Sequence, residues 1–239
     1  ELQPFLREKT IDYQMVKENL KKIRENIKKA LLKSGRKPEE ITIVAVVKGV
    51  PDFLVLEALE EGITDLGESY VVDGEKRLYA LSKFRKSFVY HLVGHLQANK
   101  VRRALKLFDF IDSVDSLKLC KIIESNAIKE NKDCNIFLEV NISGEKSKFG
   151  FNPEEIRIIL ERILKFERIK VLGLMTIAPQ SASEDELRKV FRRLSLIKEE
   201  VEKEYDLVIR FLSMGMSDDY IIALEEGSNM IRLGRAIFT

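Results

Sequence analysis

The sequence predicts an α/β protein built as a single closed (β/α)8 barrel of the TIM type, preceded by one extra helix. Two observations carry this prediction. Apolar runs and helical patterns alternate along the chain, and eight such runs fit into roughly 200 residues. Strict alternation favours a parallel sheet, because parallel neighbours need a crossover that is usually a helix. A doubly wound open sheet is the alternative, but it usually has fewer strands, and no G-x-G-x-x-G follows the first strand.

The extra helix is predicted over residues 11–33, where apolar residues recur at helical spacing ahead of Gly35 and Pro38. The eight predicted strands are 42–47, 64–67, 88–93, 108–114, 135–141, 170–176, 208–213 and 229–234. No linker, repeat or low-complexity segment separates them. We therefore expect residues 1–239 to form a single domain, with the barrel over about 42–238.

Four helices between the strands have recognisable starting residues. They are Asp52 ahead of 53–61, Asn152 with Pro153 at the head of 153–166, Ser183 with Glu186 ahead of 187–201, and Ser217 with Asp218 and Asp219 ahead of 220–226. Ser183 and Glu186 have the spacing of a capping box, and Pro153 stands at the favoured first helical position. Gly62 and Gly227 are placed to stop the helices before them.

Composition excludes several function classes. The net charge is +2, from 41 basic and 39 acidic residues, so there is neither a basic footprint for nucleic acid nor a polybasic membrane signal. With only two histidines in the chain, we do not expect a multi-histidine metal site, and the two cysteines lack metal or redox spacing. No apolar run reaches the roughly 18 residues that a membrane span needs. We expect a cytoplasmic protein.

In a parallel barrel the functional site lies where the strands end. The polar residues at these ends are Lys48, Glu68, His95, Ser113 with Asp115, Asn141, Thr176, residues 213–217, and Arg232. Lys48 is notable because it directly follows a buried-looking strand. An isolated lysine at a strand end is usually a surface residue. The functional alternative is a partly desolvated amine with a lowered pKa, which condenses with an aldehyde to form a Schiff base.

A second signal lies near the C-terminus. TIM barrels often bind phosphate with the loops after strands seven and eight. Here those loops contain 213-SMGMSDDY-220 and 231-IRLGRA-236, in which Gly215 and Gly234 permit close backbone approach. The plain alternatives are a helix cap for Ser217 and ordinary turn residues for the glycines. Lys48 and these loops are neighbours around a closed barrel, which suits a phosphate-bearing aldehyde such as a sugar phosphate or pyridoxal phosphate.

The assembled motifs resemble the YggS/PLPBP family, the pyridoxal phosphate homeostasis proteins, from Ile43 to Phe238. The segments that carry the resemblance are 44-VAVVKGVP-51, 65-DLGESYV-71, 91-HLVGHLQANKV-101, 111-IDSVDSLKL-119, 139-EVNISGEKSKFGF-151, 172-LGLMTIAP-179, 212-LSMGMSDDY-220 and 225-EEGSNMIRLGRAIF-238.

The resemblance implies a cytoplasmic, monomeric barrel of the alanine racemase N-terminal type that binds pyridoxal 5′-phosphate (PLP) on Lys48. It also implies that Arg232 faces the pyridine nitrogen and that Gly234 and Arg235 offer backbone amides to the phosphate. Ser213, Met216 and Ser217 complete the expected cofactor-binding set. The implied role is PLP homeostasis without strong turnover. The implied partners are PLP and, beyond it, amino or keto acids and PLP-dependent apoenzymes.

The chain departs from the family pattern at three positions. Arg235 stands where Thr or Ser is usual, Ser69 where Asn is common, and Gly49 where Thr is common. Two alternative functions stay open. One is a weak PLP-dependent enzyme such as a racemase, with His95, Tyr70 or Ser213 as the base. The other is a Schiff-base aldolase acting on a sugar phosphate.

Overall fold

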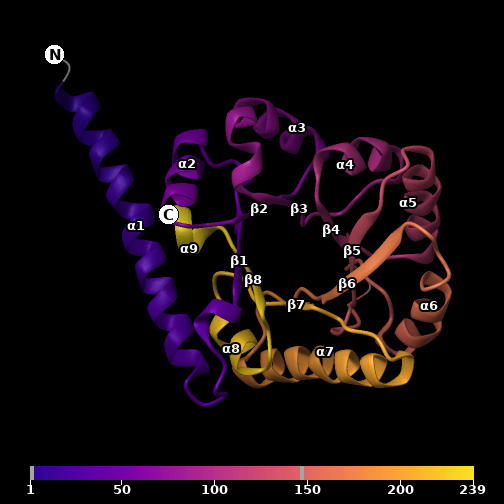
Figure 1. Cartoon of the computed structure of the whole chain (residues 1–239). Helices are drawn as coiled ribbons and strands as arrows, with labels where there is room; N and C mark the ends of the chain where they lie inside the picture. The colour runs from indigo at the N-terminus through magenta and orange to yellow at the C-terminus, as the bar shows by residue number, and fades with distance from the viewer. Residues whose placement is uncertain (1–2, 146–147) are drawn as a thin grey trace.

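The computed structural model of the chain describes residues 3–145 and 148–239, so residues 146–147 of the SGEKSKFG segment lie outside the described part. Eight parallel strands form a closed barrel in chain order, and β8 pairs with β1 to close it (Figure 1). The strands are β1 (Thr42–Val46), β2 (Asp65–Glu68), β3 (Val89–Leu92), β4 (Phe110–Val114), β5 (Cys134–Glu139), β6 (Ile169–Met175), β7 (Phe211–Ser213) and β8 (Met230–Leu233). The predicted barrel is confirmed, and each predicted strand overlaps an observed one.

The helices surround the barrel, and α1 lies along one side of it (Figure 1). They are α1 (Gln3–Leu31), α2 (Asp52–Glu60), α3 (Val71–Ala80), α4 (Val101–Leu107), α5 (Leu117–Lys129), α6 (Ile156–Ile163), α7 (Glu184–Tyr205), α8 (Tyr220–Glu225) and α9 (Arg235–Phe238). Short 3-10 turns lie at η1 (Pro38–Glu40), η2 (Ser82–Ser87), η3 (Ala98–Lys100) and η4 (Pro153–Glu155). The extra N-terminal helix is confirmed, although it starts earlier than the expected 11–33.

Two of the four predicted helix starts are confirmed by their hydrogen bonds. The Ser183 hydroxyl accepts from the Glu186 amide, and the Glu186 carboxylate accepts from the Ser183 amide, which completes the capping box. The Asn152 side chain accepts from the Glu154 amide at 3.0 Å, but it opens η4 before α6 instead of one continuous helix.

The other two predicted starts differ from the structure in part. Asp52 is the first residue of α2, not its cap, and Pro51 occupies the cap position. The Asp52 carboxylate pairs with Arg77 instead. At α8 the cap position is Asp219, one of the three residues expected there, whereas the Ser217 hydroxyl accepts from the Ala236 amide at 3.1 Å. In both cases a partner distant in sequence takes the side chain that local spacing assigned to a helix end.

The barrel interior is filled by large side chains from opposite strands. Val44, Phe137, Met175 and Met230 form one buried cluster although they come from β1, β5, β6 and β8. Residues from such distant strands meet only inside a closed barrel, so the interior is a packed core. Because side chains alternate along a strand, residues two positions beyond this cluster also point inward, at the mouth. Arg232 and Glu139 occupy such positions in β8 and β5.

The helix α1 covers the side of the barrel where β1 and β8 meet. Its buried apolar face includes Leu20, Ile23, Ile27 and Leu31. The Asn19 amide donates to the Ile237 carbonyl in α9 at 3.1 Å, and the Asn26 amide donates to the Tyr220 hydroxyl in α8 at 2.9 Å. The extra helix α1 is therefore hydrogen-bonded to α8 and α9, the two short helices that follow the loops after β7 and β8.

Candidate functional site

Lys48 lies on a tight turn just beyond β1. The Val50 amide donates to the Val47 carbonyl at 3.0 Å, and Gly49 has a φ of +71°, which favours glycine. The Lys48 side chain is exposed, with Nζ 5.1 Å from the centre of the Tyr70 ring. The expected desolvation of its stem was therefore wrong. The chain turns away from the strand after Val47, so neighbouring strands no longer cover the next side chain.

Arg232 is buried at the inner end of the same region. Its Nη1 donates to the Ser213 carbonyl at 2.9 Å and to the Ser213 hydroxyl at 2.7 Å, and its Nη2 donates to the Thr176 carbonyl at 2.9 Å. Burial lowers the pKa of this guanidinium, and the carboxylates of Asp112, Glu139 and Asp219 oppose that effect. These contacts hold a planar cation in one orientation among β6, β7 and β8.

The loop after β7 is shaped by Gly215 and Asp219. Gly215 has a φ of +98°, and a Cβ there would lie 2.6 Å from the Ala223 Cβ and 2.9 Å from the Tyr220 Cα. The Asp219 carboxylate accepts from the Met216 amide at 2.6 Å. Burial raises the pKa of Asp219, while this hydrogen bond and Arg232 oppose the rise. The backbone at 215–217 is thus held close to the start of α8.

The loops after β7 and β8 are joined directly. Besides the bond from the Ala236 amide to the Ser217 hydroxyl, the Arg235 guanidinium donates to the Asp218 carboxylate at 2.6 Å. The Arg235 side chain is largely exposed, at 73%. The amides of Gly234 and Arg235 lie at the first turn of α9, where backbone N–H groups have no intrahelical acceptor.

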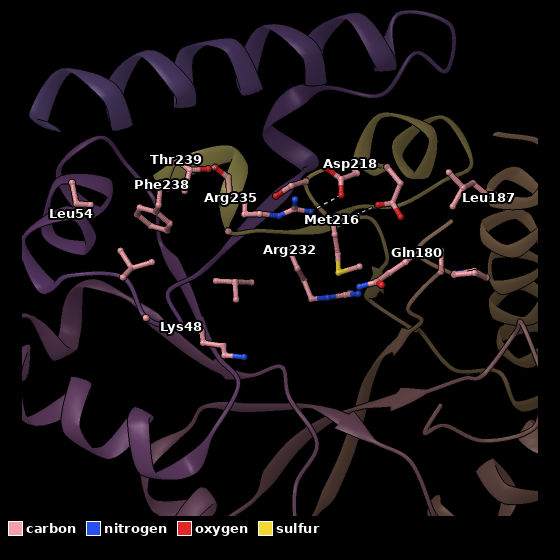
Figure 2. A pocket seen from close by; sticks show the side chains of 18 of the residues that line it. Lys48, Leu54, Gln180, Leu187, Met216, Asp218, Arg232, Arg235, Phe238 and Thr239 are labelled. Atoms are coloured by element: carbon pink, nitrogen blue, oxygen red, sulfur yellow. Dashed lines mark hydrogen bonds and ion pairs between the residues drawn. The ribbon is translucent and has the colours of Figure 1, made fainter. Parts of the chain in front are cut away.

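Six of the seven predicted site residues line one cavity of about 830 Å³ (Figure 2). They are Lys48, Met216, Ser217, Arg232, Gly234 and Arg235. Figure 2 shows the Lys48 and Arg232 side chains extending in the same direction, toward the right of the view. The seventh residue, Ser213, lies outside the lining and is fully buried, where its carbonyl and hydroxyl hold Arg232.

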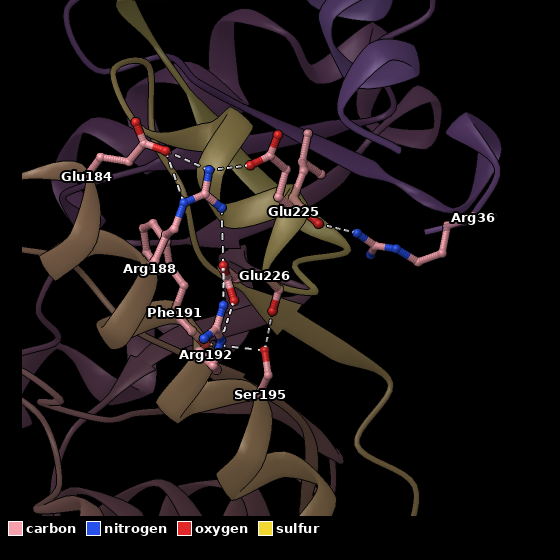
Figure 3. Close-up of polar contacts among 9 residues, drawn as sticks. Arg36, Glu184, Arg188, Phe191, Arg192, Ser195, Glu225 and Glu226 are labelled. Carbon is pink, nitrogen blue, oxygen red and sulfur yellow. Dashed lines mark hydrogen bonds and ion pairs between the residues drawn. The ribbon is translucent and has the colours of Figure 1, made fainter. Parts of the chain in front are cut away.

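The outer side of α8 is fixed by a charge cluster formed by Arg188, Arg192, Glu225 and Glu226 (Figure 3). Glu226 pairs with Arg188 at 3.2 Å and Arg192 at 2.9 Å, both from α7. The Ser195 hydroxyl donates to the Glu226 carbonyl at 2.5 Å, and Arg36 donates to the carbonyls of Leu224 and Ser228. These bonds satisfy the exposed carbonyls at the end of α8 and so hold the loop before it.

Sequence reasoning missed the acidic residues inside the barrel mouth. Glu139 ends β5 and is only 7% exposed; burial raises its pKa to about 7, against the opposing charge of Arg232. Deeper inside, His91 lies between Asp112 at 3.0 Å and Asp65 at 3.1 Å. Burial alone would lower the pKa of His91, but the two carboxylates raise it to about 9. The alternation of side chains along β5 could have predicted this position, because Phe137 faces inward and Glu139 lies two residues further on.

The three candidate bases lie outside the cavity lining of the described chain. His95 bonds through Nδ1 to Asp115 at 2.9 Å and stacks on Phe149 at 3.9 Å between ring centres. Tyr70 is exposed, with its ring under the Lys48 amine, and the Ser213 hydroxyl accepts from Arg232. In the described part of the chain, no group of three or more His, Cys, Asp or Glu side chains could hold a metal ion. The described helices include none that is long and apolar enough to cross a membrane.

Comparison with known proteins gives consistent matches over nearly the whole chain. The family described as alanine racemase, N-terminal domain, matches residues 16–239. The pyridoxal phosphate homeostasis protein of Aquifex aeolicus is 34% identical over 221 residues, covering 92% of this chain and 96% of that protein. The protein of the same name from Escherichia coli K12 is 33% identical over 222 residues, covering 92% of this chain and 94% of that protein.

Solved structures agree with this placement. The structure of PipY from Synechococcus elongatus with PLP bound has a TM-score of 0.83 and 28% identity, covering 94% of this chain and all of that one. An alanine racemase from Clostridium difficile 630 has a TM-score of 0.71 at 18% identity over 56% of its length, a likeness that shows the fold alone. This chain belongs to the family of the alanine racemase N-terminal domain and, within it, to the YggS-type pyridoxal phosphate homeostasis proteins.

Proposed function

We propose that this protein binds PLP as a Schiff base on Lys48 and serves intracellular PLP homeostasis without strong catalytic turnover. The observation that carries the proposal is one cavity that joins a lysine amine, a buried guanidinium and the backbone of two loops. Its volume of about 830 Å³ is within the range of roughly 300–1,000 Å³ typical of small-molecule sites. The names of the relatives and the PLP-bound PipY structure support the same ligand.

The residues present fit the chemical groups of PLP. When bound, PLP supplies an aldehyde that condenses with a primary amine, and Lys48 offers an exposed one. The backbone N–H groups of Ser217, Gly234 and Arg235 are offered to the phosphate, whereas the Met216 N–H already donates to Asp219. The absence of a side chain at Gly234 leaves this backbone open. A Cβ at Gly234 would lie 3.3 Å from the Val46 carbonyl oxygen, so the loop also packs closely against β1.

Arg232 is the residue that faces the pyridine nitrogen in this proposal. Its guanidinium always carries its proton, so it donates to that nitrogen and keeps it unprotonated. An unprotonated pyridine is a weaker electron sink, which favours holding the cofactor over carbanion chemistry. Ser213 takes part by fixing Arg232 through two hydrogen bonds.

A holding role is further supported by the partners of two of the three candidate bases. His95 pairs with Asp115 and Ser213 holds Arg232, whereas Tyr70 lies beside the Lys48 amine. A weak PLP-dependent enzyme is the second candidate, and the buried carboxyl of Glu139 beside Arg232 is the observation that favours it. Exchange of amino-acid α-protons in heavy water separates the two, since exchange no faster than with free PLP excludes the enzyme.

In this proposal the protein is a cytoplasmic monomer. Its partners are PLP, PLP-dependent apoenzymes, and amino or keto acids. Cys120 and Cys134 are free and buried, and burial raises the pKa of each thiol to about 12. Such thiols are poorly reactive and have no requirement for an oxidising compartment.

The test is the absorbance of purified protein mixed with PLP, before and after borohydride reduction. A band near roughly 420 nm that disappears on reduction, with the label on Lys48, is the expected result for a Schiff-base lysine. Lys48→Ala is expected to lose the covalent label and keep the fold, because its side chain lies exposed at the mouth. Lys76→Ala, which removes another exposed lysine nearby on α3, is the matched control. Unchanged covalent labelling of Lys48→Ala refutes the proposal.

A further inference from the structure

The turn that carries Lys48 is packed at its two ends, Val47 and Val50, but not in its middle. The lysine side chain and Gly49 are exposed, and the turn is closed by the single bond from the Val50 amide to the Val47 carbonyl. A group that fixes this turn would therefore control where the amine points.

Arg77, on α3, makes contacts on both sides of that turn. Its Nη2 donates to the Val47 carbonyl at 2.8 Å, which is the peptide directly before Lys48. Its Nη1 pairs with the Asp52 carboxylate at the start of α2, directly after the turn. One guanidinium thus joins the residues that enter and leave the turn, and its side chain is only 9% exposed.

The third contact of Arg77 extends to the neighbouring strand. Its Nε lies 3.5 Å from the Glu68 carboxylate at the end of β2, which is 1% exposed. The other Glu68 oxygen accepts from the Ser69 amide at 3.3 Å, just before Tyr70, whose ring lies under the Lys48 amine. The same guanidinium therefore helps to set both the lysine and the aromatic ring beside it.

Two carboxylates compensate the charge of Arg77, so we expect Arg77 to act on Lys48 through the position of the turn more than through its charge. Burial raises the pKa of Glu68, and Arg77 opposes that rise. With Glu68 and Asp52 both facing it, the positive charge of Arg77 is compensated locally. The planar fork of arginine donates to the Asp52 carboxylate and the Val47 carbonyl at once, with Glu68 3.5 Å from its Nε. A lysine ammonium, a compact point charge, lacks this fixed fork.

We propose that Arg77 is a positioning residue for Lys48. Arg77 holds the turn so that the Lys48 amine reacts with the PLP aldehyde at its full rate. This inference rests on the proposed function of Lys48. Displacement of a reacting group by about 1 Å can cost a rate on the order of 100-fold. We expect Arg77→Met to form the Lys48 adduct at least roughly 10-fold more slowly than the wild type, and Arg77→Lys to be intermediate.

The experiment measures the second-order rate of adduct formation by stopped-flow absorbance, first with PLP and then with pyridoxal. Pyridoxal lacks the phosphate, so a positioning effect on Lys48 slows both ligands by a similar factor, whereas damage to the phosphate loops slows PLP alone. Arg85→Met is the matched control. Arg85 also bridges a carbonyl, of Phe88 at 3.0 Å, and a carboxylate, of Asp109 at 2.7 Å, but at the start of β3.

The expected result is slow adduct formation in Arg77→Met with both ligands and wild-type rates in Arg85→Met. Arg77→Met rates within about twofold of the wild type overturn the inference, as does an equal loss in Arg85→Met or a loss with PLP alone. Should Arg77→Met fail to fold, Arg77→Lys decides by the same comparison. A wild-type protein without the Lys48 adduct overturns the proposed function and this inference together, whereas a normal wild type with an unaffected Arg77 variant overturns only the inference.

Discussion

Arg232 Nη1 donates to both oxygens that Ser213 offers, the carbonyl at 2.9 Å and the hydroxyl at 2.7 Å. This pairing joins β7 to β8 directly beneath the proposed cofactor site. It gives a serine outside the cavity a positioning role in the proposed site, since the orientation of a buried cation depends on its acceptors.

The first prediction concerns this pair. Ser213→Ala removes one acceptor from a buried charged donor, so we expect a loss of about 1–3 kcal/mol in unfolding free energy by urea denaturation. We also expect weaker PLP binding, followed by absorbance titration. Ser116→Ala is the control, because it removes the hydroxyl that caps α5 away from the cavity and should lower stability alone. Equal PLP affinity in both variants would contradict the role assigned to Ser213.

The second prediction concerns Arg235, the departure from the family pattern. Its side chain and that of Asp218 are 73% and 78% exposed, so their ion pair is expected to add little to stability. Arg235→Thr should change the unfolding free energy by no more than about 0.5 kcal/mol. If the backbone amide carries the phosphate contact, PLP affinity should also stay within about threefold of the wild type, a difference below about 1 kcal/mol. A larger loss in the titration would show that the guanidinium itself binds the phosphate.

The third prediction concerns Gly215. Gly215→Ala places a Cβ at a φ of +98° and 2.6 Å from the Ala223 Cβ, so the loop after β7 must move. We expect a loss of about 1–3 kcal/mol in stability and weaker PLP binding. Gly35→Ala is a useful comparison, because Gly35 also has a positive φ, of +68°, but a Cβ there meets nothing within 4 Å. Intact PLP binding in Gly215→Ala would remove this loop from the site.

The fourth prediction is a pH dependence from Glu139. Its pKa rises from an ordinary 4.5 to about 7 in the folded protein, mainly by burial. The folded state then binds more protons than the unfolded state between these values, so this group makes stability fall as the pH rises through that window. The upper bound is about 3 kcal/mol, because one pH unit corresponds to about 1.36 kcal/mol.

Glu139→Gln isolates this contribution, because the neutral amide keeps the size of the protonated carboxyl. The stability difference between the wild type and Glu139→Gln, measured by urea denaturation from pH 4.5 to 7.5, should shift against the wild type as the pH rises. His91 also loses its proton late, with a pKa of about 9, but it is present in both proteins and cancels. A constant difference over this range would show that folding does not raise the pKa of Glu139.

The fifth prediction concerns the charge cluster on α8. Glu226 accepts from Arg188 and Arg192 and is 8% exposed. Glu226→Gln should lower the unfolding free energy by about 1–3 kcal/mol, because bonds between charged groups become bonds to a neutral amide. Lys165→Met, which breaks an exposed pair with Glu161, should change stability much less. Similar effects of both changes would mean that the cluster contributes little.

The order of the eight strands, the extra N-terminal helix and four of the helices between strands could be predicted from the sequence alone. Periodic burial is a local property, so apolar runs, the Ser183 capping box and the extra N-terminal helix could be recognised before any packing was known. The closure of eight alternating units into a barrel followed from their number. Lys48 and the loops at 213–217 and 231–236 could then be placed at one mouth, because all parallel strands end on the same side.

The tertiary structure decided which side chains meet. The Ser217 hydroxyl accepts from Ala236, Asp52 pairs with Arg77, and Lys48 is exposed where desolvation was expected. Each depends on a partner far along the chain, such as the separation of 30 residues between Arg77 and Val47. Such contacts are set by strand register and helix orientation, which periodicity does not encode. The sequence thus determines the barrel and its mouth, whereas only the folded chain joins Arg232 to Ser213, Glu139 to the mouth and Arg77 to the turn of Lys48.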